Sequence, residues 1–157
     1  MNDSFQFIAL PSERFVEMFA QSDEELQKVG ARRVVVDEKP GFPCRISLID
    51  AEIGESVLLI PFVHHDVSTA YRGSGPIYIR SGVKTACPAV NEVPDMFRLR
   101  LLSIRAYDVA AMMVGAEVVN GKELEATIRR LFSDASVSYV HIHNAGPGCY
   151  NCLVVRA

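Results

Sequence analysis

The sequence has little positive charge gathered in any one place. Its 16 lysines and arginines are outnumbered by 19 acidic residues, which gives a formal net charge of -3 at pH 7. The basic runs extend no further than the pairs Arg32-Arg33 and Arg129-Arg130. Because phosphate backbones and anionic lipids attract proteins through clustered cations, nucleic acid is not expected as a partner.

Long apolar runs and an export signal are also missing. The longest apolar stretches, residues 57–63 and 109–114, are too short to cross a bilayer. Residues 1–4 show no basic segment ahead of an apolar one. We therefore expect a cytoplasmic protein that does not enter a membrane. In that reducing compartment its four cysteines are expected to remain thiols.

The composition that is present is that of a folded domain. Of the 157 residues, 49% are hydrophobic and 22% are charged, far from the polar, highly charged composition of disordered chains. A chain of this length can bury one core without metals or disulfides as cross-links. The sequence shows no internal repeat and no low-complexity segment. We predict a single domain over residues 1–157.

Alternation of apolar and polar residues, interrupted by glycine and proline turns, indicates a chain rich in short strands. Strands are predicted at residues 5–9, 34–36, 44–48, 57–62, 76–80, 101–107, 111–119, 138–143 and 149–155. A polar loop over residues 64–75 is predicted to bind a ligand, and a hairpin is expected to join residues 44–48 to residues 57–62.

Helices are predicted toward the two ends of the chain. One follows Pro11, a second follows the capping box at Ser22, and a short one follows Pro94. The strongest helical period covers residues 124–132, after a cap at Asn120. Together the elements predict an α+β fold, with a mostly antiparallel sheet of roughly six to eight strands, helices near the N-terminus and one helix before a C-terminal hairpin.

The segment around residues 139–143 carries an H-x-H pattern. Because side chains alternate between the faces of a strand, Tyr139, His141 and His143 share one face, while Val140 and Ile142 face the core. Two imidazoles on one face can serve as a metal site or as acid/base residues. The competing interpretation is that they are solvated or hydrogen-bonded strand residues without a ligand.

The remaining two histidines are adjacent, at His64 and His65, near the end of another predicted strand. A residue from this pair could complete a site begun by His141 and His143, and imidazole suits divalent transition metals. We therefore predict these four histidines as ligands of such a metal. His141 and His143 are in addition predicted as catalytic residues.

The segment Cys149-Tyr150-Asn151-Cys152 has CxxC spacing, which joins two sulfurs in many metal and redox sites. In an extended strand, however, Cys149 and Cys152 point to opposite faces with Cα atoms about 10 Å apart, beyond disulfide reach. Cys149 alone is predicted as a nucleophile beside the histidines. The alternative is that it is a small buried hydrophobic residue.

A second polar motif runs from Tyr71 to Pro76 and combines Arg72, hydroxyl groups and glycine backbone. Such a loop can hold a carboxylate or phosphate, although it lacks the length and the lysine of a Walker loop. The alternative is a simple glycine turn. The predicted ligand-binding residues are Arg45, Tyr71, Arg72, Ser74 and Asn144.

Several polar stretches occur in a fixed order along the chain. They are Gly30-Ala31-Arg32-Arg33, Pro40-Gly41-Phe42-Pro43-Cys44-Arg45, His64-His65-Asp66, Tyr71-Arg72, Ser74-Gly75-Pro76-Ile77, Arg105-Ala106-Tyr107-Asp108 and residues 141–152. With this series the chain resembles, nearly end to end, a family of uncharacterised bacterial proteins known as domain of unknown function 1203. The resemblance implies a bacterial single-domain protein and brings no activity, cofactor or catalytic residue with it.

These observations lead to two hypotheses of different classes. In the first, the protein binds a small molecule or acts as an enzyme, with a histidine-rich polar pocket that depends on a divalent transition metal. In the second, it is a non-catalytic interaction protein without a ligand site. It would then form a homodimer through a strand edge or through the apolar region around residues 109–116.

Overall fold

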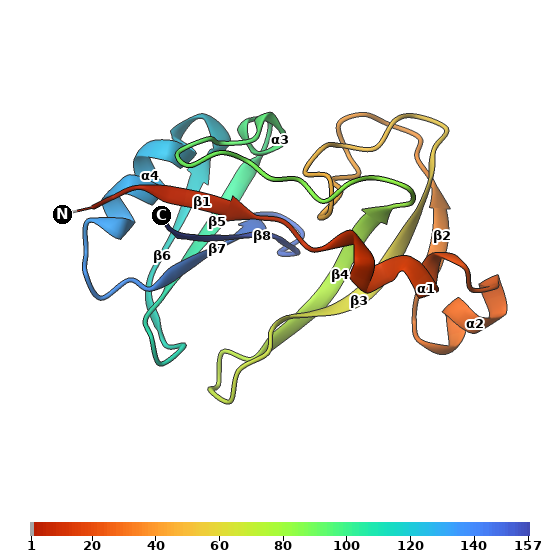
Figure 1. The fold of residues 1–157 in the computed structure, drawn as a ribbon, viewed down its shortest axis with the longest axis horizontal. Helices are drawn as coiled ribbons and strands as arrows, with labels where there is room; N and C mark the ends of the chain where they lie inside the picture. The colour runs from red at the N-terminus through yellow and green to blue at the C-terminus, as the bar shows by residue number, and fades with distance from the viewer. Residues whose placement is uncertain (1) are drawn as a thin grey trace.

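The protein contains two antiparallel β-sheets, as a computed structural model that describes residues 2–157 shows (Figure 1). The five-stranded sheet has the order β1-β8-β7-β5-β6, and the three-stranded sheet has the order β2-β3-β4. The strands are β1 (Phe5–Ile8), β2 (Arg32–Val35), β3 (Ser56–His65), β4 (Gly73–Arg80), β5 (Leu101–Tyr107), β6 (Met113–Asn120), β7 (Tyr139–Asn144) and β8 (Tyr150–Arg156). The predicted α+β class is confirmed, with eight strands among the described residues divided between two sheets.

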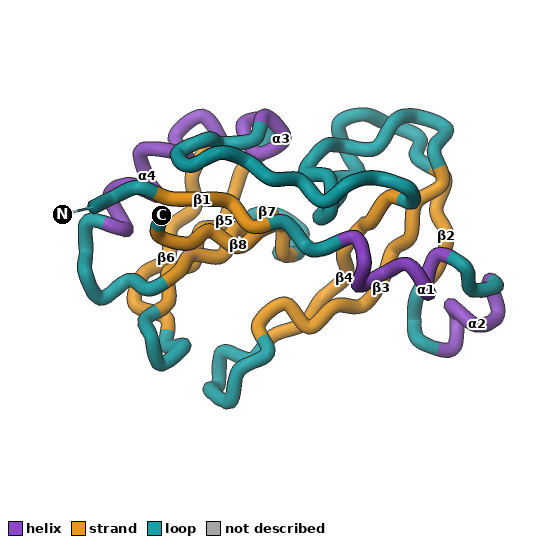
Figure 2. The backbone as a smooth tube through the Cα atoms, viewed as in Figure 1, coloured by secondary structure: helices purple, strands orange, loops and turns teal. Residues whose placement is uncertain are grey.

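Short helices lie at the outer sides of the two sheets, and long loops run between them (Figure 2). The helices are η1 (Ser12–Phe15), α1 (Val16–Phe19), α2 (Asp23–Lys28), α3 (Asp95–Arg98), η2 (Gly121–Glu123) and α4 (Leu124–Phe132). The capping box at Ser22 is confirmed, since Ser22 Oγ accepts from Glu25 N–H and Glu25 accepts from Ser22 N–H. Gly30 ends this segment with a φ of +79°, in the left-handed region that glycine favours.

The larger core lies between α4 and one face of the five-stranded sheet. Leu124, Ile128 and Phe132 lie one helical turn apart and are fully buried, which confirms the predicted helix. They pack against the apolar positions of the sheet, among them Val140 and Ile142, which face this core as their alternation predicts. The opposite face of the same sheet is therefore left to the polar residues between them.

A second core forms beneath the three-stranded sheet. Leu58 and Ile60 of β3 are buried beside Ile77 and Ile79 of β4. Phe15, from the N-terminal helices, packs into the same cluster. β3 lies between β2 and β4, as expected for a strand with an almost unbroken apolar sequence.

The strand predicted at residues 44–48 is wrong, and so is the hairpin that was to join it to residues 57–62. Cys44 forms only an isolated bridge to Tyr78, and the chain then turns, with Leu48 at a φ of +54°. The Cys44 sulfur accepts the backbone N–H of Ile46 at 3.4 Å, and Leu48 N–H donates to the Cys44 carbonyl at 3.0 Å. The apolar side chains of this segment are buried in a compact turn. Their alternation with polar residues resembles the pattern of a half-buried strand.

All four cysteines are free thiols, as predicted. Cys152 lies in the larger core, whereas Cys149 precedes β8 and is half-buried. Among residues 2–157, no helix combines the length and the apolar character needed to cross a membrane.

The junction between α3, β5 and η2 provides a test of the packing. A Cβ added at Gly121 would lie 2.8 Å from Arg98 Cα and 2.9 Å from the Arg100 carbonyl, both backbone atoms that cannot rotate away. We expect Gly121→Ala to lower the free energy of unfolding by about 2–3 kcal/mol, measured by urea denaturation. At Gly115 the same Cβ meets Leu131 at 3.6 Å, an ordinary contact. Equal losses in Gly121→Ala and Gly115→Ala would contradict this account.

Candidate metal centre

The H-x-H segment forms part of β7, at the centre of the five-stranded sheet. His141 and His143 project from the face opposite the α4 core, as alternation predicts, yet both are buried, with 4% and 0% of their surface exposed. They are covered by the end of the three-stranded sheet. Polar side chains on this face therefore lie at the boundary between the two sheets.

His64 reaches this boundary because β3 contains a bulge at its end. Val63 pairs with Ser74 and His65 pairs with Gly73, so His64 is an extra residue without a partner on β4. In a regular strand two consecutive side chains point to opposite faces, whereas a bulge turns the extra residue aside. Rings of both His64 and His65 consequently approach His141, with centroids at 6.2 and 5.0 Å.

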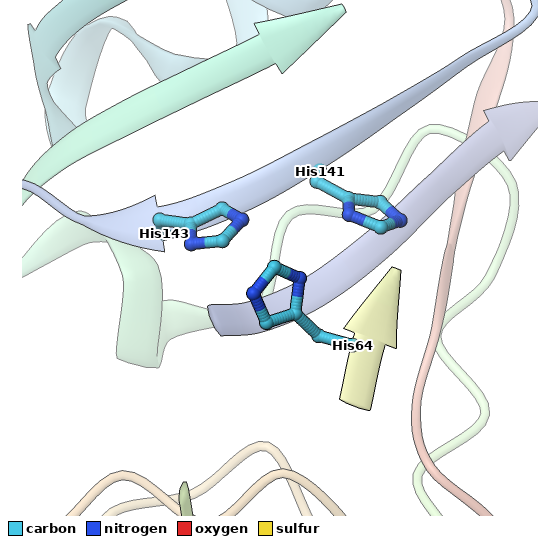
Figure 3. Close-up of side chains that lie close together, drawn as sticks. All are labelled: His64, His141 and His143. Atoms are coloured by element: carbon cyan, nitrogen blue, oxygen red, sulfur yellow. The ribbon is translucent and has the colours of Figure 1, made fainter. Parts of the chain in front are cut away.

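His64, His141 and His143 form a compact cluster, called here the three-histidine group. One ring nitrogen of each lies within 4.8 Å of the others. Figure 3 shows the three rings facing one another, with His141 and His143 projecting from β7 and His64 from the end of β3. Tyr150 stacks parallel to the His64 ring at 5.5 Å and closes one side of the cluster.

Each of the three rings has one buried nitrogen without a hydrogen-bond partner in the described part of the chain. His143 Nδ1 donates to the Gly148 carbonyl at 2.9 Å, which fixes the tautomer and leaves the lone pair on Nε2. That Nε2 atom is buried and has no hydrogen-bond partner. The Nδ1 atoms of His64 and His141 are likewise buried and without a partner among residues 2–157. Buried polar atoms without partners are rare in folded proteins and require a physical explanation.

His65 differs from the other three histidines, although it lies beside them. Its Nδ1 donates to the Tyr71 carbonyl at 2.9 Å, and its Nε2 accepts from the Tyr139 hydroxyl at 2.6 Å. Both nitrogens are therefore used within the protein. His65 was predicted as a metal ligand together with the other three, but the structure makes it a neighbour of the three-histidine group rather than a member.

Burial lowers the pKa of every imidazole in the group. Desolvation is the main cause and lowers the pKa of His64 to about 4 and those of His141 and His143 to about 3. The positive charge of Arg105 adds to the lowering at all three. The three rings are thus neutral at pH 7, which is the form that binds a metal.

Arg105 brings a cation to the same face of the sheet. It pairs with His141 across β5 and β7, in a row with Ser103 and Tyr107. Its Nε donates weakly to Ser103 Oγ at 3.4 Å, and none of the ion pairs found among residues 2–157 includes it. The group therefore lies beside a cation that no carboxylate neutralises.

Three other predicted site residues lie together, away from the three-histidine group. They are Arg45, Asn144 and Cys149. Asn144 Nδ2 donates to Cys149 Sγ at 3.1 Å, and both residues line a cavity of about 310 Å³ together with Arg45. This cavity lies beside the turn that joins β7 to β8. The histidines are not among its lining residues.

The predicted binding loop over residues 64–75 is shorter than expected, because β3 continues to His65 and β4 begins at Gly73. Arg72 is exposed and forms an ion pair with Asp66. Ser74 is exposed on β4, opposite Val63. Tyr71 does contact the histidines: its carbonyl accepts a hydrogen bond from His65 Nδ1, and its ring lies 6.1 Å from that of Tyr107.

Sequence reasoning missed several residues that shape the three-histidine group. Gly73 lies so close that an added Cβ would be 2.8 Å from His64 Cε1. The Gly148 carbonyl and the Tyr150 ring were not assigned roles either. Arg105 was not missed, since the sequence places it inside a predicted strand, where it was expected to carry an ion pair or a ligand anion. Bulges and close approaches depend on tertiary contacts and leave no period in the sequence.

Comparison with known proteins gives a single finding. The model of a family described as "Protein of unknown function (DUF1203)" matches residues 41–156. The matched segment contains His64, His141 and His143, and it leaves out residues 30–33, which also carried the resemblance. No curated protein and no solved structure matches the chain.

The lowered pKa values predict that the protein loses stability in acid when a chelator is present. Between pH 6.5 and 5 the unfolded histidines take up protons, whereas His141 and His143 stay neutral in the folded state. The unfolded state then binds more protons, so stability present above pH 6.5 is lost as the pH falls. We expect the free energy of unfolding to fall on the order of 1 kcal/mol per pH unit for each buried imidazole.

Urea denaturation at half-unit pH steps measures this slope. His143→Gln removes one titrating group and should flatten the curve relative to the unmodified chain. A slope in this window that is the same for both proteins would contradict the assignment of neutral buried imidazoles.

Proposed function

Because the chain belongs to the DUF1203 family, whose description assigns no function, we propose from the geometry alone that it is a metal-dependent enzyme acting on a small molecule. In this proposal His64, His141 and His143 hold one divalent transition metal ion. The observation that carries the proposal is that each of the three rings has a buried nitrogen without a partner. A metal ion would give all three lone pairs the partner that they lack.

The donor set suits a late first-row transition metal such as zinc. Three neutral imidazoles with a remaining free position are the ligands of catalytic zinc in several enzymes, whereas structural zinc sites use four protein ligands. A tetrahedral ion with bonds of about 2.0–2.1 Å needs its ligand atoms roughly 3.3 Å apart. The nitrogens lie within 4.8 Å of one another, so small side-chain rotations bring them into range.

The surroundings orient the ligands as metal sites require. A ligating histidine usually donates its other ring N–H to a carbonyl or carboxylate, and His143 does so to Gly148. The Tyr150 ring holds His64 in place from one side, and Gly73 allows β4 to pass beneath it. His141 is enclosed by the rings of His65, Tyr107 and Tyr150.

The residues around the three-histidine group indicate an anionic substrate. A metal in this position would supply Lewis acidity to a substrate or water oxygen. The unpaired guanidinium of Arg105 would attract and orient an anionic substrate beside it. The Tyr139 hydroxyl, hydrogen-bonded to His65, offers a proton donor and acceptor on the same face. His141 and His143 act here as ligands instead of as the acid and base first predicted.

The cytoplasmic location and the bacterial source expected from the sequence belong to the same proposal. The four free thiols support a reducing compartment, where structural disulfides do not form. The enclosed position of the histidines supports a small-molecule substrate, and the acidic net charge of the chain supports a partner other than nucleic acid.

The competing candidate is a homodimer without a ligand site. It is supported by the apolar residues exposed on the edge strand β6 and in the turn before it, including Val109 and Val118, which are 91% and 64% exposed. This candidate gives no partner to the three buried nitrogens, whereas a metal does. We therefore favour the metal-dependent enzyme.

Metal binding can be measured directly. We expect protein purified without chelator or affinity tag to bind one equivalent of Zn²⁺ or Co²⁺ per chain, by elemental analysis and by the intense visible absorption of four-coordinate Co²⁺. Because a ligand that binds only the folded state stabilises it, Zn²⁺ at a hundredfold excess over its dissociation constant should add about 2.7 kcal/mol to the free energy of unfolding.

Substitution identifies the ligands in the same assay. His64→Gln, His141→Gln and His143→Gln should each abolish stoichiometric binding, whereas His65→Gln, the adjacent histidine with both nitrogens already bonded, should retain it. Circular dichroism would verify that each variant is folded. Stoichiometric Co²⁺ binding by His141→Gln or His143→Gln would refute the site.

Two glycines of β4 provide a matched pair for the position of His64. A Cβ at Gly73 would press on Cε1 and Nε2 of that ring, at 2.8 and 3.1 Å, whereas a Cβ at Gly75 meets nothing within 4 Å. Gly73→Ala should therefore displace the ring and weaken Zn²⁺ affinity roughly 10- to 100-fold, the range found for residues that orient ligands. Competition against a chromogenic chelator measures it, and Gly75→Ala should bind as the unmodified chain does.

A further inference from the structure

Arg45 is a buried cation without a carboxylate partner. Its side chain is 1% exposed, although it belongs to a turn and not to a regular element. Nε donates to the Tyr150 carbonyl at 2.8 Å and Nη1 donates to the Pro43 carbonyl. No oxygen of residues 2–157 accepts a hydrogen bond from Nη2, and no ion pair found among those residues includes Arg45.

Among residues 2–157, this arrangement gives the guanidinium no carboxylate partner. Cys149 acts on it most, through its charge and a side-chain hydrogen bond, followed by the Cys44 thiol and the guanidinium of Arg100, which is itself positive. Burial is the main cause that lowers the pKa of Arg45. Charges that are buried this completely are normally paired with an opposite charge.

A cavity of about 310 Å³ lies against this guanidinium, a volume at the small end of ligand pockets. Pro43 and Cys149, which adjoin the guanidinium, both line it. Asn144 lines it as well, and its orientation is fixed because Asn151 Nδ2 donates to its Oδ1 at 2.7 Å. The Asn144 amide nitrogen donates one hydrogen to Cys149 Sγ at 3.1 Å, at the wall of the cavity that both residues line.

The remaining walls of the cavity are mostly apolar. They are formed by Gly41, Leu59, Pro76, Tyr78 and Pro147. A ligand that fits both kinds of wall has an oxyanion at one end and a short apolar body at the other. Inorganic phosphate would satisfy the charge and leave the apolar walls without contacts.

We propose that this cavity is a binding site for a small organic carboxylate, with the guanidinium of Arg45 and the amide of Asn144 as its anion-binding groups. Cys149 lies beside the bound carboxylate as a neighbour and not as a nucleophile. The site uses none of the three histidines, and it stands whether or not they bind a metal.

Cys149 supplies a built-in reporter for the charge in the cavity. Iodoacetate and iodoacetamide alkylate a thiolate by the same displacement of iodide, but only iodoacetate carries a carboxylate. Cys149 is half-buried and lines the cavity, Cys87 is exposed and is not among the lining residues, and Cys44 and Cys152 are buried. Peptide mass spectrometry of native protein gives the rates at Cys149 and Cys87 in one experiment.

We expect the ratio of the iodoacetate rate to the iodoacetamide rate to be about tenfold or more higher at Cys149 than at Cys87, because a nearby buried cation attracts the anionic reagent. Butyrate should slow alkylation of Cys149 and leave Cys87 unaffected, at an ionic strength held constant with sodium chloride. Phosphate should protect Cys149 only at much higher concentration. Equal rate ratios at both cysteines, or equal protection by butyrate and phosphate, would overturn the proposal.

Two variants test the origin of the effect. Arg45→Met removes the cation, and Asn144→Asp places a carboxylate beside it with almost the same shape. Both should reduce the rate ratio at Cys149 to the value at Cys87, and both should abolish protection by butyrate. If Arg45→Met does not fold, Asn144→Asp decides, since an unchanged ratio in that variant refutes Arg45 as the anion-binding group.

Discussion

The structure depends on how polar side chains are buried where its two sheets meet. Burying a polar group without a partner costs several kcal/mol in an apolar surrounding, so each such group needs a bond within the protein or to a ligand. His65 satisfies both of its nitrogens through Tyr71 and Tyr139. His64, His141 and His143 do not, although they share the same boundary. That difference distinguishes the three-histidine group from the adjacent His65, whose hydrogen bonds are complete.

Bulges make this boundary possible. A regular β3 would send His64 and His65 to opposite faces, whereas the extra residue at His64 brings both rings to the same neighbours. A second shift in register pairs Cys152 with Ile142 and Tyr150 with His143, which leaves Asn151 as the extra residue of β8. Tyr150 can thereby reach the histidines while Cys152 remains in the core. Both shifts lie next to the groups that they position.

Much of the fold could be predicted because its strands and α4 follow simple periods. β5 and β6 were predicted because residues 101–119 lack a helical period, the C-terminal hairpin was predicted from strand patterns on either side of a glycine turn, and α4 was predicted from the spacing of Leu124, Ile128 and Phe132. The common face of His141 and His143 followed from the alternation of side chains along a strand. The turn at residues 44–48 could not be predicted, since a buried turn and a half-buried strand show the same alternation. His64 was predicted as a metal ligand from its residue type. The direction of its side chain depends on a bulge in β3 that the sequence does not indicate.

The turn between β7 and β8 shows why one chemically rich segment need not form one pocket. The Gly148 carbonyl accepts from His143 Nδ1, so one side of the turn fixes a ring of the three-histidine group. The next residue, Cys149, faces Asn144 and the cavity beside Arg45 instead. Gly148 has a φ of +80°, so the chain turns here, and its carbonyl and the Cys149 side chain contact different groups. Cys149, which was predicted as a nucleophile beside the histidines, lines a cavity whose lining includes none of the four histidines.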